Sequence, residues 1–382
     1  MNKKINKVIL CANDVTQIGG VSRVIHTLAR EFMNQGFDVE LLGMNTVSQE
    51  ISFDLPDDIK NLPVTVAYSA QPPAKSANLE LWSKLRGEAV GYLRRYFEEQ
   101  DPETTLVIVL QVYVMEHLLE TGIDFSATTG FKVIGAYHSS YIGCKASNDL
   151  NRIKRAYSDI TRFICLTEKD RDLFALEGMT NGSYLYNPIE LMSDVEIPDW
   201  AERDTKLVFV GRLSREKNIP AIIDAWSKVA PDFPEWSFEI YGTGPEESKV
   251  SEAILKSGQV KRTHLMGSTQ NPEQVFASAR LNVMNSNFEG LPVSIVEAGL
   301  VGTPTLVTNT FPGAEVLVED NVTGFTPPQN DPDAYVLALR SALSDQEQLA
   351  KMGKASQTKM ERFSPNRIMQ DWDFLLKSLS II

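Results

Sequence analysis

The sequence predicts an α/β protein made of two Rossmann-like domains, each a doubly wound parallel sheet, that face a cleft. Length is the first of three observations behind this prediction, because 382 residues exceed what one hydrophobic core usually organises. In both halves, short apolar runs of strand length alternate with helical patterns, which is typical of parallel sheets covered by helices. A polar segment that contains Pro and Asp, at 187–204, separates the two series and is the best linker candidate.

The predicted strands follow one another at the spacing expected for doubly wound sheets. In the first half they are 7–12, 38–43, 64–68, 105–111, 132–138, 162–166 and 183–186. In the second half they are 206–210, 237–241, 263–266, 281–285 and 305–307. Helical patterns lie between most of them, so the strands of each half should run parallel. Ligands of such sheets bind outside the carboxyl ends of the strands, and the functional residues are therefore expected there.

Composition places the chain among globular proteins, with 43% apolar and 23% charged residues. No apolar run approaches the roughly 18 residues of a membrane span. The N-terminal MNKKINKVILCAND has basic residues before an apolar run that Asn13 and Asp14 end early. We interpret this run as a first buried strand, with a secretory signal as the alternative.

The spacing of the cysteines and the net charge exclude further classes of protein. Cys11, Cys144 and Cys165 show neither metal nor disulfide spacing, which suits reduced thiols in the cytoplasm. The net charge of −13 argues against nucleic-acid binding. The first 187 residues carry 19 basic and 23 acidic side chains and the remainder 18 and 27, so the N-terminal half is better suited to an anionic surface or substrate.

Two segments of the first half place candidate ligand-binding residues at the ends of predicted strands. In NDVTQIGGVSR the pair Gly19 and Gly20 precedes a helix and permits close backbone approach to a ligand, although such a loop alone is a weak signal. In FKVIGAYHSSY, His138 ends a predicted buried strand. A single histidine in that position is more often structural, and His26, His117 and His264 fit that interpretation. His138 differs because it would face the cleft.

An amphipathic segment at 79–97 has two interpretations. Lys84, Arg86, Arg94 and Arg95 lie beside a row of leucines and aromatic residues, which could form a membrane-surface face. The glutamates of the same segment favour an ordinary packed helix.

The segment LVFVGRLSREKN, at 207–218, predicts a diphosphate site. A β-rich run ends at Gly211, where glycine lets the backbone turn, and Arg212 and Lys217 follow before the next helix. A guanidinium fork and an ammonium group five residues apart can converge on one diphosphate. The alternative is a solvated basic loop, but its position at a strand's carboxyl end favours binding.

The segment NFEGLPVSIVEAG, at 287–299, is the most informative of the chain. It sets Glu289 in a turn and Glu297 in the following helix, and Pro292 suits the first turn of that helix. The helix start would direct backbone amides and the positive end of the helix dipole at an anion; these amides belong to Gly290, Leu291, Val293 and Ser294. Carboxylates that bind hydroxyls on both sides of a diphosphate would recognise a nucleotide sugar. The alternative is a strand–turn–helix with surface glutamates.

Three other patterns carry no site. GTGPEE at 242–247 lacks the third glycine of a dinucleotide fingerprint, so it predicts a turn that lines a nucleotide pocket. The DxD patterns at 331–333 and 371–373 open a helix and lie within one, respectively, and no His/Cys cluster exists elsewhere. We therefore expect no metal and no cofactor.

Together these segments resemble the retaining glycosyltransferases of family 4, which have the GT-B fold. GRLSREKN, the E-x7-E motif of Glu289 and Glu297, and the glycine- and threonine-containing run at 302–324 occur in the family's order. GGVSR and the strand-end His138 carry a weaker resemblance in the first half. The C-terminal FSPNRIMQDWDFLLKSL resembles the helix that returns to the first domain. The resemblance implies an acceptor-side domain of 1–187 plus 365–382 and a donor-binding domain of 188–364.

The resemblance also implies roles for single residues. Arg212 and Lys217 would bind the donor diphosphate, Gly20 would approach it, and Glu297 would bind the ribose. Glu289 would hold the transferred sugar with the amides of 290–294, and His138 would lie at the reacting sugar. The base-contacting residues would be Gly242, Met266, Ser268 and Thr269. Many relatives have Asp or Asn after this histidine where this chain has Ser139, so the hydrogen bonding of His138 is an open point.

The activity implied is metal-independent, retaining transfer of a hexose or N-acetylhexosamine from a nucleotide sugar, most simply UDP-linked. The implied acceptor is a glycan, glycolipid or cell-wall polymer, modified in the cytoplasm or peripherally at the inner membrane face. Alternatives are a GT-B-fold UDP-sugar 2-epimerase and a non-catalytic partner subunit. The first would release UDP and free sugar without an acceptor, and the second would lack the charged site. The sequence does not predict the sugar, the nucleotide or the oligomeric state.

Overall fold

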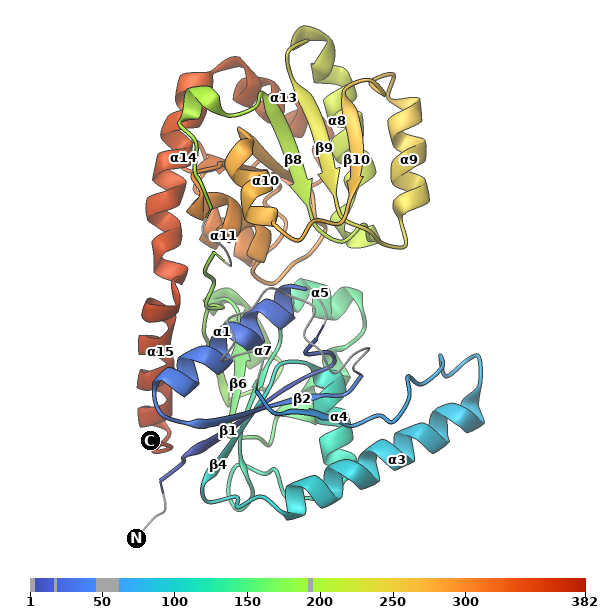
Figure 1. Cartoon of the computed structure of the whole chain (residues 1–382), viewed down its shortest axis with the longest axis vertical. Coiled ribbons are helices and arrows are strands. Elements are labelled where there is room, and N and C mark those ends of the chain that lie inside the picture. Colours follow the sequence, from blue (N-terminus) through green and yellow to red (C-terminus); the bar gives the residue numbers. More distant parts are fainter. Residues whose placement is uncertain (1–3, 17–18, 46–61, 192–194) are drawn as a thin grey trace. The chain divides into compact units, whose positions relative to one another are not determined.

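The computed structural model describes residues 4–16, 19–45, 62–191 and 195–382. The chain divides into two compact units (Figure 1). Unit 1 contains Met1–Pro188 and Pro365–Ile382, and unit 2 contains Ile189–Ser364. Each unit is built around its own parallel sheet.

Unit 1 has a sheet of seven strands within its described residues, all paired in parallel. Their spatial order is β3 (Val64–Val66), β2 (Asp38–Gly43), β1 (Lys7–Ala12), β4 (Thr105–Val109), β5 (Lys132–Ala136), β6 (Arg162–Cys165) and β7 (Gly182–Tyr184). The central strands are buried almost completely, which explains why they appear in the sequence as continuous apolar runs rather than alternating ones.

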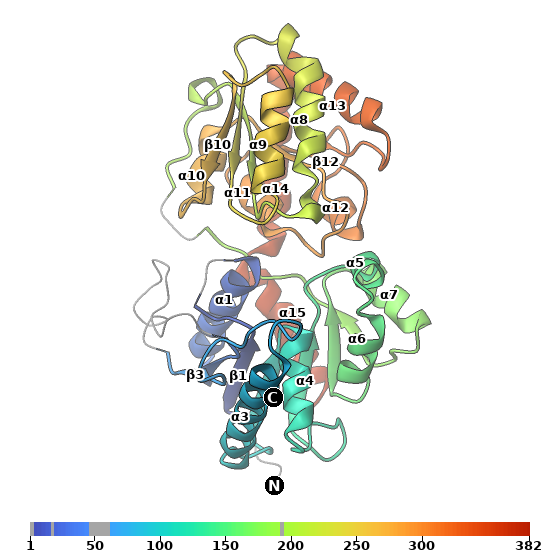
Figure 2. The ribbon, with the colours of Figure 1, turned by 90° about the vertical axis from the view of Figure 1, so that its right-hand side faces the viewer.

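Helices cover both faces of this sheet and separate its core into two clusters (Figures 1 and 2). The helices are α1 (Gly20–Asn34), α3 (Leu79–Glu98), α4 (Val112–Glu120), α5 (Tyr141–Ala146), α6 (Leu150–Tyr157), α7 (Glu168–Leu176) and α15 (Pro365–Ser378). One cluster contains α3 and α4 side chains, and the other contains those of α1 and α15. The sheet therefore has a packed layer on each side, as a doubly wound fold requires.

The helix α3 is a packed helix along one face. Leu85, Ala89, Leu93 and Phe97 recur at helical spacing and are buried in the core of unit 1. Its first turn is capped by the side chain of Asn78, which accepts the Leu81 amide at 3.0 Å. The interpretation of 79–97 as an ordinary amphipathic helix is thus the one that the structure supports for this face.

The last helix of the chain, α15, completes the core of unit 1. Trp372 is 3% exposed and packs edge-on against Phe32 of α1, with ring centroids 5.7 Å apart. Leu376 of the same helix is fully buried, whereas Phe374 points outward and is 77% exposed. The N-terminal unit is therefore closed by residues from the opposite end of the sequence.

Unit 2 has a six-stranded parallel sheet within its described residues. The order is β10 (Thr263–Gly267), β9 (Ser237–Tyr241), β8 (Lys206–Val210), β11 (Leu281–Met284), β12 (Thr305–Val307) and β13 (Gly324–Phe325). Its helices are α8 (Ile219–Val229), α9 (Glu247–Lys256), α10 (Pro272–Ser278), α11 (Val293–Leu300), α12 (Pro312–Leu317), α13 (Pro332–Ser344) and α14 (Gln346–Met360). Figure 1 shows them packed on both sides of the strands.

The prediction of two doubly wound parallel sheets is confirmed. Five predicted strands, β1, β2, β8, β9 and β12, have the expected bounds, and the others differ by one to two residues at their ends. The sequence analysis missed β13, which has only two residues and shows no periodicity. The cleft between the sheets stays a prediction. No helix in the described part of the chain is long and apolar enough to cross a membrane.

We expect Trp372→Ala to destabilise unit 1 by about 3–5 kcal/mol, because it empties a buried aromatic site between α15 and α1. Calorimetric unfolding, together with hydrogen exchange of the α1 amides, measures the effect. The control is Phe374→Ala, which removes an exposed ring from the same helix and should change little. Equal losses in the two variants would show that α15 is not part of the core.

Candidate functional site

Close backbone contacts shape the carboxyl edge of the sheet in unit 2. Gly242 follows β9 with φ +140°, and a Cβ there would lie 1.9 Å from the carbonyl oxygen of Gly211, after β8. The Leu213 amide donates to the carbonyl of Thr243 at 2.9 Å, so the two loops bond backbone to backbone. Only glycine fits this approach, which is the physical reason for the glycines in GTGPEE.

A second backbone link connects the loop after β8 with the loop after β11. The amide of Asn287 donates to the carbonyl of Glu216 at 2.7 Å. Glu216 lies in a single 3-10 turn, Arg215–Lys217, which Asn218 ends in the left-handed conformation with φ +49°. The link brings Lys217 and Glu289, which are 72 residues apart in sequence, to the same place.

The two side chains form a hydrogen-bonded ion pair between Lys217 Nζ and Glu289 Oε1. They are only 16% and 17% exposed, so water screens the pair less than it screens a surface salt bridge. The sequence analysis expected both residues at this edge but gave them separate ligands. In the structure, the two side chains bind each other.

The helix α11 begins beside this pair. Pro292 is its N-cap with an extended ψ of 115°, one residue before the first helical turn in which it was expected. A Cβ on Gly313 would lie 2.0 Å from the carbonyl oxygen of Gly290, so α12 packs against the turn that precedes α11. Val293 and Ser294 are partly buried in the first turn, where helix amides have no partner within the helix.

Glu297 lies one turn further along α11 and is 4% exposed. A carboxylate so deeply placed is not one of the surface glutamates of the alternative interpretation, because burial of a charge requires compensating contacts. Glu289 is also mostly shielded. Both carboxylates are therefore held inside the structure at the carboxyl edge of the sheet, not on its outer surface.

The remaining candidates of unit 2 are more exposed. Arg212 follows Gly211 and its side chain is exposed to solvent. Met266 is 47% exposed at the end of β10, and Ser268 is exposed beyond it. Thr269 accepts the amide of Asn271 at 3.1 Å, which shapes the loop after β10. These residues occupy the same carboxyl edge as the ion pair, since β10, β9 and β8 are neighbours in the sheet.

In unit 1, His138 lies two residues beyond β5, and Gly20 is the first residue of α1. Both positions are at the carboxyl edge of the first sheet, as expected. His138 Nε2 is buried and has no hydrogen-bond partner among the described residues. Burial lowers the pKa of His138 to about 4, so the imidazole is neutral at neutral pH and its unpaired nitrogen can interact with a ligand.

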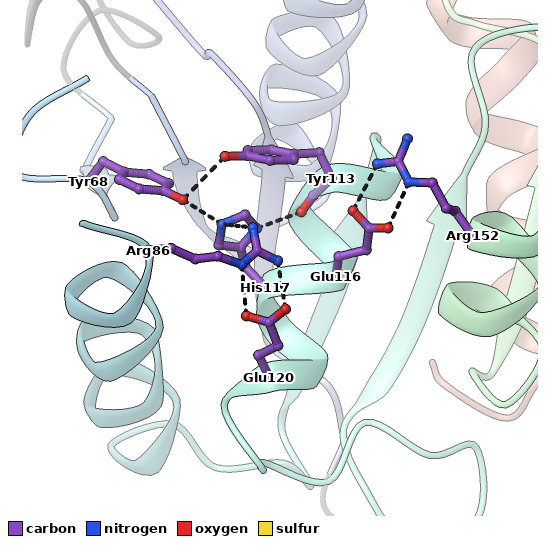
Figure 3. A network of polar contacts seen from close by, with 7 residues as sticks. All are labelled: Tyr68, Arg86, Tyr113, Glu116, His117, Glu120 and Arg152. Carbon is purple, nitrogen blue, oxygen red and sulfur yellow. Dashed lines mark hydrogen bonds and ion pairs between the residues drawn. The ribbon is translucent and has the colours of Figure 1, made fainter. Parts of the chain in front are cut away.

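His117, which was interpreted as structural, is fully buried, and both of its ring nitrogens have hydrogen-bond partners. In Figure 3, His117 is part of a polar network that includes Tyr68, Arg86 and Tyr113. The network joins residues of three separate segments, so no local pattern could have predicted it. The other two histidines are ordinary: His26 is buried in α1 and bonds the carbonyl of Val15 at 2.9 Å, and His264 is exposed.

No group of three or more His, Cys, Asp or Glu residues that could hold a metal ion occurs in the described part of the chain. The cysteines Cys11, Cys144 and Cys165 are buried and unpaired with one another, and burial raises the pKa of each thiol. They are inert packing residues rather than nucleophiles.

The chain resembles known proteins in sequence. Residues 193–359 match the model of the family described as "Glycosyl transferases group 1". A poly(glycerol-phosphate) alpha-glucosyltransferase of Bacillus subtilis is 23% identical over 312 residues, which are 78% of this chain and 46% of that protein. An uncharacterized glycosyltransferase of Haemophilus influenzae is 22% identical over 377 residues, 98% of this chain and the whole of that protein. The chain thus spans under half of the first relative and all of the second.

Solved structures share its fold. Sucrose-phosphate synthase from Thermosynechococcus elongatus has a TM-score of 0.80 at 15% identity and covers 98% of this chain and 99% of its own. S. aureus TarM, in complex with fondaparinux, alpha-GlcNAc-glycerol and UDP, has a TM-score of 0.76 at 12% identity and covers 97% and 99%. At such identities the likeness shows the fold alone, which is GT-B.

We expect Glu289→Gln to strengthen binding of inorganic pyrophosphate by roughly three- to tenfold. The Glu289 carboxylate competes with pyrophosphate for the Lys217 ammonium, and the neutral amide of glutamine does not. Calorimetric titration measures it. The matched control is Glu347→Gln, which breaks an exposed ion pair with Lys351 on α14 and should leave the affinity unchanged. Weaker pyrophosphate binding in Glu289→Gln would contradict the competition.

Proposed function

We propose that the chain transfers a hexose or N-acetylhexosamine from a nucleotide sugar to a glycan, glycolipid or cell-wall polymer, because residues 193–359 match the glycosyl transferases group 1. The observation that carries this proposal is the shielded Lys217–Glu289 pair beside the start of α11, with Glu297 buried one turn away. It offers a cation, helix amides and two carboxylates at one edge of a sheet. That set matches an anion flanked by hydroxyl groups.

The diphosphate of the donor would bind Lys217, Arg212 and the amides of 290–294, and Gly20 of unit 1 would approach it. Arg212 supplies a bidentate fork and Lys217 a point charge. The start of α11 adds the positive end of a helix dipole. Negative charge grows on the leaving diphosphate as the sugar bond breaks, and these fixed groups stabilise it without a metal ion.

The two carboxylates would recognise the hydroxyls on either side of the diphosphate. Glu297 would accept hydrogen bonds from the ribose, and Glu289 from the transferred sugar. Gly242, Met266, Ser268 and Thr269 would contact the base. The choice of a UDP-linked donor is supported by solved relatives of the same fold that contain UDP with glucose or with GlcNAc.

The reaction we propose retains the configuration of the donor. The acceptor oxygen attacks the anomeric carbon from the face that the diphosphate leaves, and a leaving phosphate oxygen takes the acceptor proton. His138, neutral and with an unpaired Nε2, would contact the reacting sugar from unit 1. No covalent nucleophile is needed, which agrees with the buried thiols. Exclusion of water would limit hydrolysis of the donor.

The acceptor class rests on relatives whose names concern surface polymers, among them the glucosyltransferase that acts on poly(glycerol phosphate) and an amylovoran biosynthesis glycosyltransferase. We propose that the chain works in the cytoplasm, with a peripheral contact at the inner membrane face. The exposed start of α3 supports that contact, since Leu79 is 58% and Leu81 41% exposed and Lys84 lies beside them.

Glu297→Gln should lower the affinity for UDP and for the UDP-sugar by roughly tenfold or more, because it weakens charge-assisted bonds to the ribose, and should spare inorganic pyrophosphate. Lys217→Met, in contrast, should weaken the binding of all three ligands. Calorimetric titrations with the same three ligands compare the variants. If Glu297→Gln lost as much affinity for pyrophosphate as for UDP, the assignment of Glu297 to the ribose would be wrong.

Transfer should persist in excess EDTA, and the product should keep the α configuration of the donor. The reason is the complete set of fixed positive groups for the diphosphate. Product formation with and without EDTA, followed by the anomeric coupling constant in NMR, measures both properties. Activity that only magnesium or manganese restores would contradict the metal-free site. UDP release with an epimerised free sugar and no transfer would favour the epimerase instead.

A further inference from the structure

The strand order of unit 1 reverses between β1 and β4, which are neighbours although β2 and β3 lie between them in sequence. In open α/β sheets, this switch point is where a crevice opens at the carboxyl ends of the strands. The described residues that directly follow β3, β2, β1 and β4 lie at this end of the strands. None of their polar side chains has a role in the proposed donor site.

Hydrogen bonds connect these four loops in a closed circuit, which we call the rim. Its members are Tyr68, Met44, Asn45, Asn13, Gln111 and Tyr113. The Tyr68 amide donates to Met44 at 3.1 Å, and the Asn45 amide donates to the carbonyl of Asn13 at 2.7 Å. The Asn13 amide donates to Gln111 Oε1 at 2.7 Å. The circuit closes where the hydroxyls of Tyr113 and Tyr68 lie 3.2 Å apart.

Two acceptor atoms of the rim have no hydrogen-bond partner among the described residues. They are Asn13 Oδ1 and Asn45 Oδ1, and both are buried. A buried amide oxygen without a donor is destabilising by roughly 1–3 kcal/mol, so each such atom calls for a partner. The two residues follow adjacent strands, β1 and β2. A ligand with hydroxyl donors at the rim would satisfy both oxygens.

The network of Figure 3 lies next to the rim and has a surplus donor. His117 Nδ1 lies 2.8 Å from the carbonyl of Tyr113, which only accepts, so Nδ1 carries the proton and Nε2 has the lone pair. The Tyr68 hydroxyl at 2.7 Å and Arg86 Nη1 at 2.9 Å both face that lone pair. When Arg86 occupies it, Tyr68 donates to the Tyr113 oxygen. The Tyr113 hydroxyl hydrogen is then available to a ligand.

The charged side chains of this network are paired, Arg86 with Glu120 and Arg152 with Glu116. Arg86 forms a bidentate pair with Glu120, at 2.9 and 2.7 Å (Figure 3). Burial lowers the pKa of His117 to about 4, and the imidazole is neutral. A phosphate would meet no net positive charge here and would face the two amide oxygens, which repel it. A neutral polyol both donates and accepts, so it complements the unpaired oxygens and the free hydroxyl together.

We propose that the rim binds a neutral sugar residue, with its hydroxyls donating to Asn13 Oδ1 and Asn45 Oδ1 and accepting from the Tyr113 hydroxyl. The sugar site itself is independent of the proposed function. The identification of the bound sugar as part of the acceptor rests on that function. The site deepens that function by assigning residues of unit 1 to a neutral glycan rather than to a phosphate-bearing portion of the acceptor.

Binding of glucose, N-acetylglucosamine and lactose to the full chain, measured by saturation-transfer NMR without donor, tests the site. We expect Tyr113→Phe to weaken the sugar that binds best by about fivefold, the value of one hydrogen bond, and Asn45→Ala to do so independently. The control Tyr92→Phe makes the same change on the exposed surface of α3 and should have no effect. Inorganic phosphate should not compete with the sugar.

Three results would overturn the rim site. They are unchanged sugar affinity in both rim variants, competition by phosphate, and no measurable binding of any of the three sugars to the wild-type chain. UDP binding serves as the folding control, since the donor residues of unit 2 are untouched. Because the readout needs no transfer, failure of the proposed function would appear separately, as absent transfer by a chain that still binds sugar.

Discussion

Parallel strand pairing is the constraint on which the rest of the structure depends. Within each unit, all described strands run in one direction, so their carboxyl ends meet at a single edge. The sheet faces are filled by helices and apolar side chains, and they leave no room for polar chemistry. Functional side chains must therefore lie in the loops at that edge. The candidate residues accordingly lie at the ends of strands, in the loops that follow them, or in the first turns of the next helix.

In unit 2 this edge is made rigid by backbone contacts rather than by side-chain packing. The carbonyl of Gly211 lies where a Cβ of Gly242 would be, and the carbonyl of Gly290 lies where a Cβ of Gly313 would be. Loops held this closely fix the positions of the charged side chains that they carry. In the Lys217–Glu289 pair, each charged group satisfies the other. Under the proposed function, a diphosphate that binds Lys217 would have to displace the carboxylate of Glu289.

The two units present different chemistry at their edges. Unit 2 has shielded charges and a helix start, which suit an anion with hydroxyl groups beside it. Unit 1 has amide oxygens, phenol hydroxyls and an arginine neutralised by Glu120, which suit a neutral polyol. This difference is physically consistent with group transfer. The leaving group carries the negative charge and the attacking group is a neutral hydroxyl, so only one of the two sites needs fixed positive charge.

The sequence by itself determined the architecture and the location of the charged site. Buried parallel strands are continuous apolar runs that end at Gly, Asn or Asp, and for this reason strands such as β1 and β8 could be predicted to the residue. The motif around Glu289 and Glu297 is local, so its spacing was visible too. Only the tertiary structure decided which side chains meet. Lys217 pairs with Glu289 across 72 residues, and Tyr68 reaches Tyr113 across 45. Such contacts depend on strand order, which no local periodicity encodes.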